Sequence, residues 1–519
     1  MRESLKPYES YPVHDLLSQT AGKLPNTVAI IDGKNSFTYQ QIEKFSTQLS
    51  NGLINLGITK GDKVGILAPN CAEYVIAFYA ITKVGAVVTT INSGYREREI
   101  SHQISDSDCK LLIVHDSLAE LFKNTTDLLS QPIETLIIDV DKTANSSFWN
   151  LINKSSSQLP DVSIDPNKDL AALPYSSGTT GLTKGVMLSH FNLVSNVKQL
   201  LGLTSLAKIV NSDIVLVHLP LFHIYGMNVL MNGSIAAGAT QIMMGRFDLN
   251  EFLNLIQKHR VTKLFTVPPV GLALSDSKNL LNHDLSSINL AFFGAAPLSA
   301  ELQERIQNQL SCPVIQGYGL TESSPLTNAD YAEPHLQKLG SIGPAASDTE
   351  QKIVDVEDPS KEMAYGETGE LLVRGPQVMK GYYKNEEATS ETISNTGWLH
   401  TGDIGRMDED GYVWILDRKK ELIKYKGFQV PPAELEGLLL EHSDVADAAV
   451  IGLPDLESGE IPKAFIVKTT GSTVNESELM EYIASKVATF KQIREVEFIE
   501  TIPKNPSGKI LRRLLKETS

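Results

Sequence analysis

Short apolar runs alternate with amphipathic stretches in the first part of the chain, and this alternation limits the fold more than any other feature. Buried strands are predicted at residues 63–69, 86–91, 110–115 and 134–140, with helices at 73–83 and 97–108. Strands that alternate with helices form parallel sheets covered by helices on both faces. The pattern therefore predicts an α/β fold with doubly wound sheets.

The alternation starts again after residue 190, with strand-like runs at residues 213–220, 263–269, 289–297 and 313–319. Amphipathic helices are predicted at residues 248–260 and 299–310, the second with Ser299 as its N-cap. Ligands of such sheets bind beyond the carboxyl ends of the strands. Glycine-rich segments occupy these ends (YSSGTTG, GAAP and GYGLTE), so we expect the ligand site there.

From about residue 340 onward, the sequence pattern becomes one of short strands separated by turn signals, which predicts a β-rich subdomain. The last hundred residues have a compact α+β pattern. A chain of 519 residues is too long for one compact domain. We expect a large N-terminal domain over residues 1–416, a connection at 417–420 and a small C-terminal domain over 421–519.

Charge and cysteine content exclude several classes of function. The net charge of −16 argues against a nucleic-acid partner, because phosphate binding depends on basic surface. The three cysteines lie far apart, which predicts neither a disulfide framework nor a zinc site and fits a reducing cytosol. The most apolar run, residues 74–91, is interrupted by Lys83 and Gly85 and is interpreted as a buried helix and strand. No integral membrane segment and no signal peptide are expected, and a cytoplasmic location is predicted.

The stretch YSSGTTGLTKGVMLSH, from Tyr175 to His190, is rich in groups that hold phosphate. Hydroxyls and glycine amides can surround oxyanions, and a lysine can neutralise them. The stretch does not match the common P-loop, because Thr183 replaces the second glycine and Gly185 follows Lys184. Composition alone leaves a phosphate loop and an ordinary solvated loop equally open.

Three later segments carry further candidate groups. In GYGLTES, Thr321 and Glu322 offer hard oxygen ligands suited to Mg²⁺. Asp403, at the end of GWLHTGD, could accept hydrogen bonds from ribose hydroxyls. Near the C-terminus, PKNPSGKILRR presents Lys509 as a point charge for a phosphate group. Read singly, each segment has a plain structural alternative: an acidic turn, a hairpin turn and a frayed basic tail.

Together, in their order, these motifs resemble the adenylate-forming acyl-activating superfamily. With GELLVRGP and DRKKELIKYKGFQVPPAELE they span residues 25–515, and LPLFHIYGMN is similar to 4-coumarate–CoA ligase and its relatives. The resemblance implies a mobile C-terminal domain and a two-step reaction. A carboxylic acid first attacks Mg·ATP to give an acyl-adenylate and pyrophosphate, and coenzyme A then displaces AMP. A homodimer is compatible with the resemblance.

The resemblance also implies a role for residues at matching positions. Thr321 and Glu322 would hold Mg²⁺, and Lys509 would be the catalytic lysine of adenylation. Thr321, Glu322 and His223 are also implied to be catalytic. The residues implied to bind ATP or AMP are Ser176, Ser177, Gly178, Thr179, Thr180, Lys184, Ala295, Ala296, Gln316, Gly317, Tyr318, Thr321, Asp403, Arg418 and Lys509.

Rotation of the C-terminal domain about Lys420 would withdraw Lys509 and bring a second loop to the site. This implies a catalytic role for Lys424 in thioester formation. The residues implied to bind coenzyme A are Arg246, Lys426, Gly427 and Gln429.

The acid itself is the least constrained part of the resemblance. Amino-acid-activating relatives commonly carry an aspartate where this chain has His223, so an amino-acid substrate is disfavoured. Plant relatives tend to have lysine and serine where this chain has Phe292 and Phe293, which favours a less polar acid. The residues implied to line the acyl pocket are His223, Tyr225, Val229, Phe292, Phe293, Gly294, Gly319, Pro325 and Leu326.

The leading hypothesis is thus an AMP-forming carboxylate–CoA ligase for a short or medium aliphatic, fatty or arylacrylic acid. One alternative is a free-standing adenylation enzyme that loads a carrier protein. Another is a luciferase-like monooxygenase that acts on the adenylate.

Overall fold

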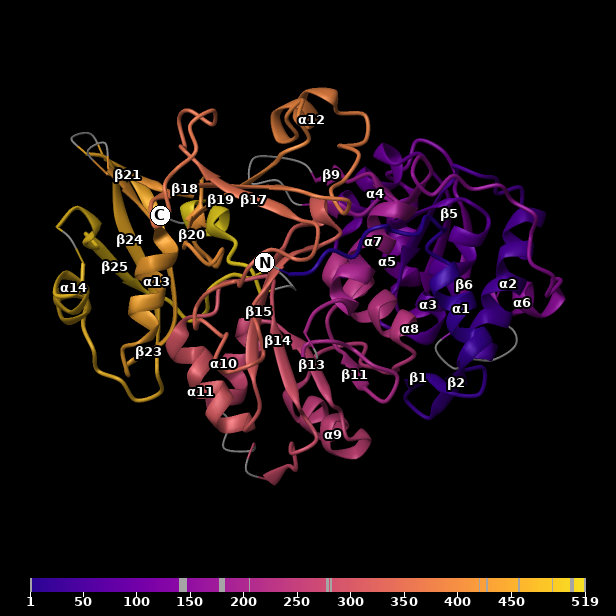
Figure 1. The fold of residues 1–519 in the computed structure, drawn as a ribbon, viewed down its shortest axis with the longest axis horizontal. Helices are drawn as coiled ribbons and strands as arrows, with labels where there is room; N and C mark the ends of the chain where they lie inside the picture. Colours follow the sequence, from indigo (N-terminus) through magenta and orange to yellow (C-terminus); the bar gives the residue numbers. More distant parts are fainter. Residues whose placement is uncertain are drawn as a thin grey trace.

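Two large, mostly parallel sheets form the greater part of the molecule (Figure 1). The computed structural model describes residues 2–139, 147–176, 183–204, 206–276, 280, 282–419, 421–425, 428–455, 458–487, 489–504 and 508–517. The six-stranded sheet has the order β10 (Leu188–Ser189), β7 (Leu170–Ala172), β4 (Val87–Thr90), β3 (Lys63–Leu67), β5 (Cys109–His115) and β6 (Glu134–Ile138). Its central strands are parallel, as the alternation predicts.

The second sheet has eight strands and carries most of the candidate site. Its order is β16 (Leu326–Ala329), β15 (Val314–Gly319), β14 (Leu290–Phe293), β13 (Lys263–Thr266), β11 (Ile214–Val217), β12 (Thr240–Met243), β1 (Val28–Asp32) and β2 (Asn35–Thr38). The pairs at both edges are antiparallel and the inner pairs are parallel. The predicted α/β fold is confirmed.

Helices pack against both sheets, as expected for a doubly wound fold. They are α1 (Asp15–Lys23), α2 (Tyr39–Asn55), α3 (Ala72–Lys83), α4 (Glu97–Asp106), α5 (Ala119–Thr126), α6 (Ser147–Lys154), α7 (His190–Leu201), α8 (Gly233–Ala237), α9 (Leu249–His259), α10 (Pro268–Asp276) and α11 (Ala300–Leu310). A π-helical segment, Tyr225–Asn232, precedes α8 and was not expected from the sequence.

Helix α3 explains the most apolar run of the chain. It contacts β1 of one large sheet and β3 and β4 of the other, and all of its residues are buried. A helix enclosed on every side needs no polar face. Its lysine, Lys83, has a fully buried side chain that pairs with Glu43 Oε1 at 2.8 Å. The predicted buried helix and strand are confirmed, and in the described part of the chain no helix has the length and apolar character of a membrane span.

A four-stranded antiparallel sheet follows, made of β17 (Glu350–Val354), β18 (Thr368–Arg374), β19 (Leu399–Met407) and β20 (Val413–Arg418). Helix α12 (Glu386–Thr392) lies between β18 and β19 in the sequence. This is the predicted β-rich subdomain. Strand β20 continues to Arg418, so the first part of the predicted connection belongs to this sheet, whereas Lys420 lies outside the described residues.

The C-terminal part builds a separate sheet with its own hydrophobic core. Its strands are β22 (Phe428–Val430), β21 (Ile423–Tyr425), β24 (Gly459–Lys468), β23 (Val445–Asp455) and β25 (Glu495–Phe498), and its helices are α13 (Pro432–Leu440), α14 (Glu476–Ala484) and α15 (Arg512–Glu517). In Figure 1 it is coloured yellow and lies beside β17–β20. The predicted α+β character is confirmed, and the exact domain boundaries stay a prediction.

Candidate active site

The turn after β14 and the end of β15 form one wall of the candidate site. Ala295 in this turn has a left-handed backbone (φ +67°) and is exposed. The side chain of Gln316 is buried and holds the turn: it accepts the Leu298 N–H and donates to the Leu298 carbonyl, both at 3.0 Å. Gln316 thus fixes the segment that carries Ala295 and Ala296.

Tyr318, Asp403 and Arg418 meet beside this wall. Asp403 and Arg418 are paired across β19 and β20, and Arg418 Nε lies 2.6 Å from Asp403 Oδ1. The Tyr318 hydroxyl donates a hydrogen bond to Asp403 Oδ2. The Asp403 carboxylate raises the pKa of Arg418, so the guanidinium keeps its charge. The structure therefore brings together three residues from three strands, as the resemblance implied.

Lys509 lies within electrostatic range of this group. Burial lowers the pKa of Lys509, and the Arg418 charge lowers it further, whereas the Asp403 charge acts in the opposite direction. The preceding residue, Gly508, packs against α10: a Cβ on Gly508 would lie 2.7 Å from Pro269 Cγ, and its φ is +83°. Only glycine satisfies both conditions without strain. This contact sets the C-terminal domain against the N-terminal domain with Lys509 at the site.

The segment that follows Lys509 is anchored inside its own domain. Arg512 makes two hydrogen bonds to the Glu436 carboxylate, at 2.7 and 2.8 Å, and a further one to Glu421. A buried charge without a partner would destabilise the fold, and here the guanidinium and the two carboxylates neutralise one another. The Lys509 segment is therefore rigidly connected to α13.

The phosphate-loop candidate is a short hairpin. Strands β8 (Tyr175–Ser176) and β9 (Lys184–Gly185) are antiparallel, with Ser176 opposite Lys184. Ser189 caps α7 at the end of the stretch by accepting the Asn192 N–H at 3.2 Å. The loop residues Ser177, Gly178, Thr179 and Thr180 lie outside the described residues.

Glu322 connects this hairpin to the eight-stranded sheet. It lies in a short 3₁₀ helix, Thr321–Ser323, that follows β15. Its Oε1 accepts hydrogen bonds from Ser176 Oγ at 2.9 Å and from the Tyr382 hydroxyl at 2.8 Å. Tyr382 also lies under Lys184, whose Nζ is 5.0 Å from the ring centroid. Tyr382 was missed by the sequence analysis, and the segment KGYYKN has no signal that would have marked it.

Thr321 and Glu322 fit a Mg²⁺ ion that arrives with a nucleotide. Mg²⁺ commonly binds one or two protein oxygens together with substrate phosphates and water. Among the described residues no cluster of three His, Cys, Asp or Glu side chains could hold a metal ion without such phosphates. The oxygen-only donor set agrees with this mode of binding.

The predicted acyl-pocket residues divide between two faces of β14. The Phe292 ring lies over Gly317, where a Cβ would be 2.2 Å away, and Gly294 similarly faces the Tyr225 ring. The Tyr225 hydroxyl donates to the Phe292 carbonyl at 3.1 Å. Phe293 points to the opposite face, where it packs near Gly271 of α10. The structure therefore groups Phe292 with Tyr225 and places Phe293 among the covering helices.

The remaining pocket candidates differ in exposure, and His223 and Gly319 are half-buried. Val229, Pro325 and Leu326 are buried, and a Cβ on Gly319 would clash with the Pro325 carbonyl at 1.9 Å. His223 Nδ1 accepts the Tyr225 N–H at 3.3 Å. Burial lowers the pKa of His223 to about 4, so its ring is neutral near pH 7.

The second loop of the C-terminal domain is only partly described. Lys424 is exposed on β21, and its N–H donates to Glu460 Oε2 at 2.8 Å. Lys426 and Gly427 lie outside the described residues, as does the side chain of Gln429. Arg246 is exposed in the turn between β12 and α9.

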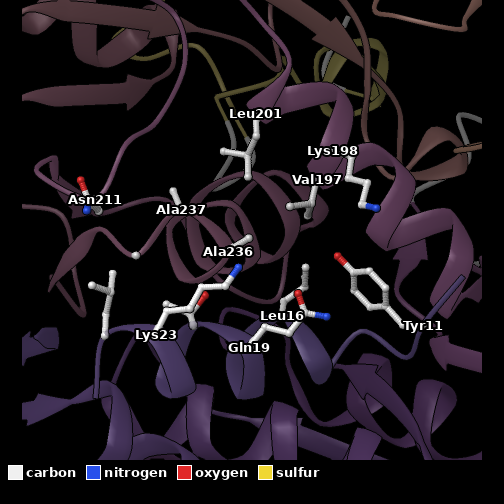
Figure 2. A pocket seen from close by; sticks show the side chains of 13 residues that line it. Tyr11, Leu16, Gln19, Lys23, Val197, Lys198, Leu201, Asn211, Ala236 and Ala237 are labelled. Atoms are coloured by element: carbon white, nitrogen blue, oxygen red, sulfur yellow. The ribbon is translucent and has the colours of Figure 1, made fainter. Parts of the chain in front are cut away.

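A cavity of about 450 Å³ lies elsewhere, between α1, α7 and α8 (Figure 2). Its lining includes Leu16, Val197 and Ala236, as well as Lys23 and Lys198. None of the predicted site residues lines it. The cavity is therefore separate from the candidate active site.

The fold and the site together define a two-domain adenylate-forming enzyme. The chain belongs to the AMP-binding enzyme family: residues 17–383 match the AMP-binding enzyme and residues 434–509 match the AMP-binding enzyme C-terminal domain. The resemblance inferred from the motifs is confirmed.

Individual relatives cover almost the whole chain. 4-Coumarate–CoA ligase 2 of Solanum tuberosum is 41% identical over 97% of this chain and 93% of its own. The ATP-bound MatB structure from Rhodopseudomonas palustris is similar with a TM-score of 0.89 and 28% identity over 98% of this chain and 99% of its own. The o-succinylbenzoate CoA synthetase of Bacillus subtilis, in complex with an acyl-adenylate intermediate, has a TM-score of 0.84 and 30% identity, over 98% of this chain and 99% of its own.

Proposed function

We propose that this protein is an AMP-forming carboxylate–CoA ligase. The observation that carries the proposal is that Lys509 lies within electrostatic range of the Asp403–Arg418 pair, which supports its role as the lysine of adenylation. The similarity to a 4-coumarate–CoA ligase and to a CoA synthetase that holds an acyl-adenylate supports it.

In the first step, a carboxylate oxygen of the acid attacks the α-phosphorus of ATP, and pyrophosphate leaves. Asp403 would hold the ribose hydroxyls, with Arg418 keeping the carboxylate in place. The hairpin around Ser176 and Lys184 would hold the triphosphate, and Lys509 would stabilise charge that develops on the phosphates. Mg²⁺, when bound to Glu322 and Thr321, would neutralise phosphate charge. The adenine would lie along Ala295, Ala296, Gly317 and Tyr318.

In the second step, the coenzyme A thiol attacks the acyl carbonyl, and AMP leaves. Rotation about Lys420 would withdraw Lys509 and bring Lys424 to the adenylate. The groups proposed to contact coenzyme A are Arg246, Lys426, Gly427 and Gln429. Two loops with separate lysines on one domain support a cycle in which each loop serves one half-reaction.

The acyl pocket favours an acid with an apolar, uncharged tail, either arylacrylic or medium-chain aliphatic. Tyr225 and Phe292 offer aromatic faces, and the Tyr225 hydroxyl is already bonded to the Phe292 carbonyl. Neutral His223 offers no positive charge for a distal carboxylate. An unpaired carboxylate buried against such a wall costs several kcal/mol.

A panel of matched acids tests the ligase and its specificity together. With MgATP and coenzyme A, we expect hexanoate and cinnamate to exceed adipate and 4-carboxycinnamate by at least about 100-fold in kcat/KM, because only the latter bury a second charge. Pyrophosphate release and loss of free thiol measure the two half-reactions, and a mixture without acid is the control.

Each other outcome has a distinct meaning. Equal rates for hexanoate and adipate would contradict the assigned pocket while leaving the ligase reaction intact. If pyrophosphate is released but the coenzyme A thiol is not consumed, and a carrier-protein thiol is consumed in its place, the protein would be a carrier-loading enzyme. Oxygen uptake without coenzyme A consumption would identify a monooxygenase.

A further inference from the structure

Tyr382 lies where two parts of the nucleotide site meet. Its hydroxyl donates to Glu322 Oε1 at 2.8 Å, and its ring lies 5.0 Å from Lys184 Nζ. Only 9% of the residue is exposed. One side chain therefore contacts both the proposed magnesium ligand and the proposed triphosphate lysine.

The backbone around Tyr382 is tied to the same two elements. Tyr382 forms an isolated β-bridge with Val186, just after β9. On either side of it, the Tyr383 N–H donates to the Gly185 carbonyl and the Met379 N–H donates to the Glu322 carbonyl, both at 2.8 Å. The position of the ring is thus fixed relative to the hairpin and to the 3₁₀ helix at once.

We infer that Tyr382 is a positioning residue for Mg·ATP, whose hydroxyl orients Glu322 and whose ring supports Lys184. This inference rests on the proposed function. Ser176 and Tyr382 both donate to Oε1, so neither engages Oε2, which the inference assigns to Mg²⁺. A carboxylate held by two donors loses rotamer freedom before the ion arrives, which lowers the entropic cost of binding.

The two contacts of Tyr382 can be removed separately. Tyr382→Phe deletes the hydroxyl and keeps the ring under Lys184. Tyr382→Leu deletes both. The matched control is Tyr383→Phe, because the Tyr383 hydroxyl donates to Asp108 at 2.9 Å in an exposed position.

Isothermal titration of the full-length protein with ATP, in EDTA and in Mg²⁺, distinguishes the two contacts. For Tyr382→Phe we expect metal-free ATP affinity within about twofold of wild type and Mg·ATP affinity about tenfold weaker, the effect of one hydrogen bond to a charged group. For Tyr382→Leu we expect metal-free affinity to fall about threefold as well, because the contact between the lysine and the ring is lost. Tyr383→Phe should match wild type.

An equal loss of affinity with and without Mg²⁺ in Tyr382→Phe would overturn the inference, and so would behaviour identical to Tyr383→Phe. Circular dichroism checks that each variant is folded. If Tyr382→Leu is not folded, the affinities of Tyr382→Phe alone test the inference. The titration needs no acid. If no acid in the panel caused pyrophosphate release from ATP, the ligase proposal would be refuted and the titration result would still stand.

Discussion

Replacing Lys509 by alanine should reduce acid-dependent pyrophosphate release by about 100- to 1000-fold, the usual effect of removing a group that stabilises transition-state charge. Gly508 packs closely against Pro269, and the next residue, Lys509, lies within electrostatic range of Arg418 and Asp403. The rate of thioester formation from a synthetic acyl-adenylate should change little, since Lys424 serves that step. Stopped assays of each half-reaction measure both rates.

Two variants serve as controls for this result. Lys504→Ala removes a lysine of the same segment that pairs with Asp447 at 2.6 Å, and should leave both half-reactions near wild type. Lys424→Ala should show the reverse pattern, with adenylation kept and thioester formation lost. Equal loss of both half-reactions in Lys509→Ala would refute the assignment of one loop to each step.

Replacing Asp403 by asparagine should raise the KM for ATP by about 10- to 100-fold, because charge-assisted hydrogen bonds to the ribose are lost. It should also lower the free energy of unfolding by about 1–2 kcal/mol, because the buried Asp403 side chain loses its charge-assisted contacts with Tyr318 and with the partly exposed Arg418. Steady-state kinetics with varied ATP and urea denaturation measure the two effects.

Asp408→Asn is the matched control for this variant. Asp408 follows the same strand and pairs with Lys338 at 2.6 Å, but the Asp408 carboxylate is partly exposed, whereas the Asp403 carboxylate is buried. A pair of this kind contributes at most about 1 kcal/mol. A KM for ATP unchanged in Asp403→Asn would show that this carboxylate does not hold the ribose.

The location of the site could be predicted from the sequence, because parallel strands end at a common edge. GAAP follows β14, GYGLTE begins in the last residues of β15, and the two strands are direct neighbours. Lys509 could be placed there only through the resemblance, because no local pattern predicts how two domains meet. The hydrogen bond from Tyr382 to Glu322 joins residues 60 positions apart, and a tyrosine beside glycine has no periodicity that would reveal it.

The direction of individual side chains was the least predictable part. Phe292 and Phe293 must point to opposite faces of a strand, but the sequence does not say which face holds the ligand. Gln316 was implied to bind ATP or AMP, and the sequence does not reveal that its amide bonds both the N–H and the carbonyl of Leu298. The π-helical segment Tyr225–Asn232 depends on tertiary packing, since its apolar sequence is equally suited to an α-helix.

The close contact of Gly508 with Pro269 has a kinetic meaning under the proposed cycle. While Gly508 lies on α10, the C-terminal domain cannot bring its second loop, which carries Lys424, to the adenylate. The two half-reactions are therefore separated in time. Pyrophosphate must therefore leave before coenzyme A reacts, and initial-rate plots at varied ATP and coenzyme A should give the parallel lines of a ping-pong mechanism. Under this cycle, the contact of Gly508 with Pro269 would have to break before coenzyme A reacts.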